Sequence, residues 1–141
     1  MHEGLREHIR CAIGDRTAPN DSLLAEVNRL SEQTLTAADV YIRSGAVCNN
    51  QVNHNGSRFT DRALDQIAAL FNEGDTNWHK QHDVYSTQGG LPLGRAFKAA
   101  VEPMPGYEGG KQVRVWWYYL KGDPEGDRCE RYIAAQIWRE L

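Results

Sequence analysis

One segment near the C-terminus constrains the fold more than any other part of this chain. Residues 112–120 read QVRVWWYYL, a run of β-branched and aromatic residues that predicts a β-strand. Successive side chains of a strand point to opposite sides, so this run places large aromatic rings on both faces. One face can pack against helices of the core. The other must lie under a further element or against a partner molecule.

Two interpretations of this strand stay open. It is either a buried central strand or an interface in an assembly, because aromatic residues are enriched in both settings. Stacking on nucleic-acid bases has little support, since basic interleaving is limited to Arg114 and Lys121. The candidate interface residues are the four aromatic residues of this strand and one arginine of the strand before it: Trp116, Trp117, Tyr118, Tyr119 and Arg95.

The chain has the size and composition of one folded domain. Its 141 residues are 40% hydrophobic and 25% charged, which is enough to bury one core but not two. The net charge of −3 disfavours general nucleic-acid binding, which usually shows as a basic patch. No apolar run is long enough to span a membrane, and the N-terminus has no signal pattern. Widely spaced cysteines without a CxxC pair indicate reduced thiols in a cytoplasmic setting: Cys11, Cys48 and Cys129.

The pattern along the chain predicts an α+β domain. Helices are expected within residues 3–13, from a cap at Asn20 or Asp21 to Leu30, from a cap at Thr60 to Phe71, and after residue 127. Strands are expected at residues 40–47, 76–82, 93–101 and 112–120. These elements predict a small antiparallel or mixed sheet, or a partial barrel, of four to five strands with two to four packed helices. Residues 1–36 form an N-terminal helical segment and residues 37–141 the α+β core of a single domain.

Two of these elements carry more detailed predictions. The helix that begins after Thr60 has Phe59 and Leu64 placed for a hydrophobic staple. In the strand at 93–101, alternation places four apolar residues on one face: Leu93, Phe97, Ala99 and Val101.

The clearest candidate for chemistry lies between residues 78 and 97. A strand ends at His82 and Asp83, and a glycine-rich loop then leads to the LPLGR segment at residues 91–95. A histidine in this position can act as a general base, or it can simply hydrogen-bond the loop that follows it. As a base it needs a nucleophile within reach. The candidate serines are Ser44, Ser57 and Ser86, none of which has a GxSxG context, and no cysteine is marked as activated.

Neither a metal nor a cofactor is expected. His79 and His82 form an HxxH pair whose members lie on opposite faces of a strand, so they do not readily chelate one ion, even with His54 near. The glycines at 89, 90 and 94 match no phosphate-binding pattern and are predicted to be turn residues.

Taken in order, several segments carry a family resemblance. They are the strand at Val40, the helix start at Phe59–Thr60, the QHD…LPLGRAF run, the VRVWWYYL strand and the terminal DRCERYIAAQIWREL segment. This order, over residues 40–141, resembles the tailed-phage prohead proteases, which are head maturation proteases with a herpesvirus-protease-like fold. In that family a histidine, typically followed by an aspartate, precedes a PLGR-like or PIGR-like strand. The resemblance therefore implies that His82 and Asp83 occupy the catalytic histidine position.

The sequence departs from the family at the nucleophile. The family's serine follows the helix, in a strand that begins after an E-[VL]-S turn. The sequence ends at Leu141, where that strand would begin, so we expect no covalent step unless a second polypeptide supplies the serine.

Three functions follow from these observations. We favour a phage virion structural or capsid-assembly protein, of the decoration or scaffold-associated type, that binds a capsid or other phage structural protein. We expect it to form a homo-oligomer in the virion or the host cytoplasm. The second hypothesis is a head maturation serine protease fragment, or half of a split protease, that uses His82. The third is a small phage-encoded inhibitor or ligand-binding protein with a pocket at His82 and Arg95.

Overall fold

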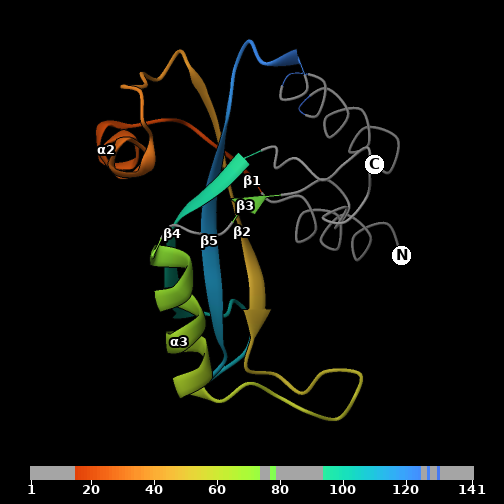
Figure 1. The fold of residues 1–141 in the computed structure, drawn as a ribbon. Coiled ribbons are helices and arrows are strands. Elements are labelled where there is room, and N and C mark those ends of the chain that lie inside the picture. The colour runs from red at the N-terminus through yellow and green to blue at the C-terminus, as the bar shows by residue number, and fades with distance from the viewer. Residues whose placement is uncertain (1–14, 74–76, 79–93, 125–126, 128–129, 131–141) are drawn as a thin grey trace, which may run out of the picture.

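The computed structural model describes residues 15–73, 77–78, 94–124, 127 and 130 (Figure 1). Its elements, in chain order, are β1 (Asp15–Thr17), α2 (Asp21–Leu30), β2 (Val40–Asn49), α3 (Asp61–Asn72), β3 (Asn77–Trp78), β4 (Gly94–Pro103) and β5 (Lys111–Leu120). The predicted helix at 3–13 and the apolar stripe of the predicted C-terminal helix lie outside the described residues.

Both described helices begin at caps that the sequence predicts. The side chain of Asn20 accepts a hydrogen bond from the Leu23 N–H at 2.9 Å, and Thr60 Oγ1 accepts one from the Ala63 N–H at 3.0 Å. Each cap satisfies a backbone donor that the first helical turn leaves without a partner. Phe59, which the sequence predicts to pack on Leu64 as a hydrophobic staple at the start of α3, is 45% exposed.

The described strands form one antiparallel sheet in the order β1-β2-β5-β4-β3. The predicted small α+β fold is therefore confirmed, and β5, the aromatic strand, lies at the centre of the sheet. The sequence did not predict β1, whose three residues pair with Ile42–Ser44 of β2. Such a short edge strand has too few residues for its side-chain alternation to be recognised.

The two helices cover opposite faces of the sheet. α3 packs Leu64 and Ala68 on residues 113, 115, 117 and 119 of β5. α2 packs Leu23 and Val27 against Val40, Ile42 and Phe97, with residues 116 and 118 of β5 beside them. The odd- and even-numbered residues of β5 thus serve different apolar clusters, as strand alternation requires. We call these the α3 face and the α2 face.

A bulge in β4 overturns one prediction from the sequence. Phe97 does not share a face with Ala99 and Val101: it is fully buried on the α2 face, whereas these two residues pack on the α3 face. The pairing with β5 shifts between Ala96 and Lys98, so one extra residue enters β4 there. Such an insertion reverses the side-chain direction on one side of the bulge, and simple alternation cannot anticipate it.

Gly94 is a strand residue and not the predicted turn glycine. It opens β4 and pairs with Trp78 of β3. A Cβ atom at this position would clash with the carbonyl oxygen of Tyr118 and would lie 3.2 Å from the Cβ of Tyr119. The glycine is therefore required by the close approach of two backbones.

Candidate functional site

The predicted catalytic pair, His82 and Asp83, lies outside the described residues together with the glycine-rich loop and Ser86. Arg95, the described member of the predicted pocket, donates from Nη1 to the carbonyl oxygen of Leu30 at 3.3 Å. Leu30 ends α2, where a cation complements the negative end of the helix dipole. This contact ties β4 to α2.

The described candidate nucleophiles are Ser44, Ser57 and Cys48. Ser44 is buried on the α2 face, 3.3 Å from Arg114 Nη1, and Ser57 lies in the exposed loop after β2. Burial raises the pKa of the Cys48 thiol, which disfavours the reactive thiolate. Within the described part of the chain, none of the three is hydrogen-bonded to a histidine or carboxylate that could act as its base.

The four aromatic residues of β5 divide between the two faces. Trp117 and Tyr119 are 7% and 1% exposed in the cluster under α3. Trp116 and Tyr118 are partly buried on the α2 face, where Lys98 Nζ lies 4.7 Å from the centre of a Trp116 ring. Burial also raises the pKa of Tyr118. Packing within the chain therefore takes up most of the aromatic surface that the sequence suggested as an interface.

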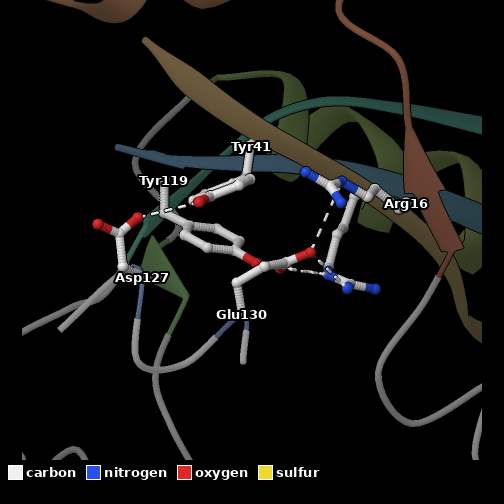
Figure 2. A network of polar contacts seen from close by, with 6 residues as sticks. Arg16, Tyr41, Tyr119, Asp127 and Glu130 are labelled. Atoms are coloured by element: carbon white, nitrogen blue, oxygen red, sulfur yellow. Dashed lines mark hydrogen bonds and ion pairs between the residues drawn. The ribbon is translucent and has the colours of Figure 1, made fainter. Parts of the chain in front are cut away.

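A polar cluster on the α3 face joins the C-terminal segment to the sheet. Arg43 of β2 donates to Glu130 from Nε at 3.1 Å and from Nη2 at 2.9 Å, a two-pronged ion pair. Tyr119 donates its hydroxyl to the same carboxylate, and Arg16 of β1 approaches it from the side with Nε at 3.7 Å (Figure 2). Arg43 and Glu130 are 4% and 9% exposed, whereas the Arg16 side chain is 60% exposed.

A second set of contacts lies beside this ion pair. Tyr41 donates to Asp127 at 3.0 Å, and its ring lies 5.2 Å from that of Tyr119 (Figure 2). The hydrogen bond to Asp127, followed by burial, raises the pKa of Tyr41. Asp127 also accepts from the Gly122 N–H at 3.2 Å, which closes the turn after β5. Through these contacts β2 and β5 both bind Asp127 and Glu130.

The chemistry of this cluster is that of a structural ion pair. A carboxylate removed from water needs a cation and hydrogen-bond donors, and Arg43, Arg16 and Tyr119 supply them. Its acidic groups are already engaged by donors from the chain. Among the described residues, no three His, Cys, Asp or Glu side chains are grouped to hold a metal ion. His54 lies in the exposed loop.

The opposite end of the sheet carries two loops that are tied to each other. Asn50 accepts from the Lys111 N–H at 2.9 Å and donates to the Gly109 carbonyl at 3.3 Å. Lys111 also forms an ion pair with Asp61 at 3.1 Å, and this contact lowers the pKa of Asp61. The loop at 50–60 and the β4–β5 turn at 104–110 therefore form one unit, which we call the loop end (the lower end of Figure 1).

The loop end exposes several large apolar side chains. Val52, Phe59 and Tyr107 are 66%, 45% and 56% exposed, and Val47, at the bulge in β2 that leads to the loop, is 50% exposed. Exposed apolar side chains on anchored loops are candidates for protein binding.

The sequence did not identify the Arg43 cluster or the loop end. The arginine does carry a signal, because it interrupts the strand VYIRSGAV with a charge where an apolar residue is expected. Glu130 carries none, since a glutamate on a predicted helix is usually solvated. The residues of the cluster are far apart in the chain, and only the fold brings them together.

Comparison with known proteins found no matching protein-family model, no matching curated protein and no matching solved structure. Within the described residues, no helix is long and apolar enough to cross a membrane. The resemblance to the prohead proteases therefore stays a prediction from the sequence.

Proposed function

We propose that this chain takes part in the assembly of a tailed-phage head, with a prohead-protease-like fold, and that it binds a capsid or other phage structural protein. The loop end carries this proposal. It presents Val52, Phe59 and Tyr107 to solvent on loops that Asn50 and Lys111 hold in place. Loops fixed in this way lose little conformational freedom when a partner binds.

The described nucleophiles also favour binding over catalysis. Ser44 is buried, Ser57 is held in an exposed turn by Asn53, and burial raises the pKa of the Cys48 thiol. In the part of the chain that the structure describes, the polar clusters connect elements of the fold to one another. Protein binding requires no catalytic group, and the exposed apolar side chains of the loop end are sufficient for it.

Co-sedimentation with capsids or proheads of the same phage tests this proposal. We expect the chain to pellet with them, and the double variant V52S/Y107S to lose at least about tenfold in affinity. Leu70→Ser is the matched control, because Leu70 is 60% exposed on α3, outside the loop end. Equal binding by V52S/Y107S and the parent chain would contradict a role for the loop end, and no binding by the parent chain would contradict the proposed function.

A head maturation protease, or a portion of one, is the second candidate. The family resemblance rests on the order strand, capped helix, strand, strand. The elements β2, α3, β4 and β5 follow one another in this order, which supports the second candidate. In this candidate His82 is the general base. Incubation with capsid or scaffold protein, followed on a gel, separates the two candidates: cleavage that His82→Ala abolishes supports the protease. Binding of an uncleaved partner supports the assembly protein.

A further inference from the structure

The outer edge of β4 is covered by side chains where a neighbouring strand would otherwise pair. Within the described residues, β3 pairs with β4 at Gly94 and Arg95. Farther along the same edge, the Asn72 carboxamide donates to the Ala99 carbonyl at 2.9 Å and accepts from the Ala99 N–H at 2.8 Å. A side-chain amide thus makes both hydrogen bonds that an added strand would make with one residue.

A second side chain supports this arrangement. Arg29 of α2 donates from Nη2 to the carbonyl of Phe97 at 3.4 Å and to the backbone carbonyl of Asn72 at 3.3 Å. Asn72 is the last residue of α3, so the helix fixes its position while Arg29 holds its backbone. Pro103 ends β4 and has no N–H to offer a pairing strand.

An uncovered edge of this kind would be a template for strand addition. The β4 edge is also a suitable partner for itself, because two copies can pair antiparallel about a two-fold axis and present the same residues to each other.

We propose that Asn72, supported by Arg29, is an edge cap that keeps β4 from pairing with β4 of a second copy of this chain. The cap lies outside the loop end. It therefore prevents β4–β4 pairing between two copies regardless of which partner the loop end binds. While the Asn72 amide is in place, the N–H and carbonyl of Ala99 are already hydrogen-bonded, so they are not available to a strand of a second copy.

The test compares Asn72→Ala with Asn28→Ala by light scattering coupled to size exclusion. Asn28 of α2 makes the same two-way contact with a backbone, at 2.8 and 3.0 Å, but its partner is Leu35 in the segment after α2 and not a residue of a strand. Both variants lose a pair of hydrogen bonds. We expect N72A to form an assembly of about twice the parent's mass, with self-association at least about tenfold stronger, and N28A to keep the parent's mass.

Two further variants make the result decisive. Asn72→Lys loses the same bonds but places a charge at the edge, so it should not associate. If N72A is too unstable to purify, Asn72→Ser replaces it, because a hydroxyl is too short to reach both backbone groups. In the associated variant, hydrogen exchange at the Ala99 amide should be slower than in N72K. Equal masses for N72A and N28A, or fast exchange at Ala99 in the assembly, would overturn the proposal.

Discussion

The guanidinium of Arg43 donates two hydrogen bonds, of 3.1 and 2.9 Å, to the carboxylate of Glu130 on the α3 face of the sheet. The two residues are 87 positions apart in the chain, and both are buried. Tyr119 of the central strand donates to the same carboxylate. Among the described contacts that Asp127 and Glu130 make with the sheet, this is the ion pair in which both partners are buried.

Breaking this ion pair from one side should destabilise the protein strongly. Arg43→Ala leaves the Glu130 carboxylate buried without its main partner, and we expect a loss of about 3–5 kcal/mol in the free energy of unfolding. Arg43→Lys should also be destabilising, since an ammonium group cannot make the two-pronged contact. The double variant R43M/E130M should recover most of the loss. Urea unfolding measures all three, and a double variant no more stable than R43A would contradict this account.

Phe97 should be among the most sensitive apolar positions. It is fully buried against α2 by the bulge in β4, so Phe97→Ala should cost about 3–5 kcal/mol in unfolding free energy. Val47 lies at the bulge in β2 and is 50% exposed, so Val47→Ala should change stability by about 0.5 kcal/mol or less. Chemical unfolding of the two variants compares them directly. Similar losses in both would show that Phe97 is not packed as described.

Gly94 and Gly106 should respond to alanine for different reasons. At Gly94 a Cβ clashes with the backbone of Tyr118, and we expect Gly94→Ala to cost about 3 kcal/mol or more. At Gly106, in the β4–β5 turn, φ is 82° and the space is open, so Gly106→Ala carries the strain of the left-handed backbone alone, about 1 kcal/mol. Thermal unfolding measures both. An equal cost would mean that β4 and β5 can separate to admit the methyl group.

Asp39 should contribute to stability in a pH-dependent way. Its carboxylate accepts hydrogen bonds from the backbone N–H and the hydroxyl of Thr36, at 2.7 and 2.9 Å, and these lower its pKa. A lowered pKa stabilises the fold above the unfolded-state value of about 3.9, and this contribution disappears as the pH falls through the folded-state pKa. Asp39→Asn should therefore narrow the difference between the urea midpoints at pH 7 and pH 3. If the difference between the two urea midpoints is the same in Asp39→Asn and in the parent chain, the Asp39 carboxylate does not stabilise the fold as described.

Much of the fold could be predicted from local signals in the sequence. The caps at Asn20 and Thr60 and the apolar stripes of α2 and α3 are short-range patterns, and the structure has both helices at those places. The strands β2 and β5 follow from runs of β-branched and aromatic residues, and β4 was expected from the alternation of its apolar residues. Alternation failed at Phe97, because a bulge depends on how two strands pair and not on either strand alone.

The sequence by itself determined the kinds of element in this protein and the presence of aromatic rings on both faces of its strongest strand. Those features depend on side-chain preference and on the period of the backbone, which act over a few residues. The tertiary structure decided that β5 is the central strand and that its aromatic rings are largely buried within the chain. It also brought Arg43 into contact with Glu130. It also placed Asn72 on Ala99. These contacts join distant parts of the chain, so they exist only after the sheet and its helices have assembled.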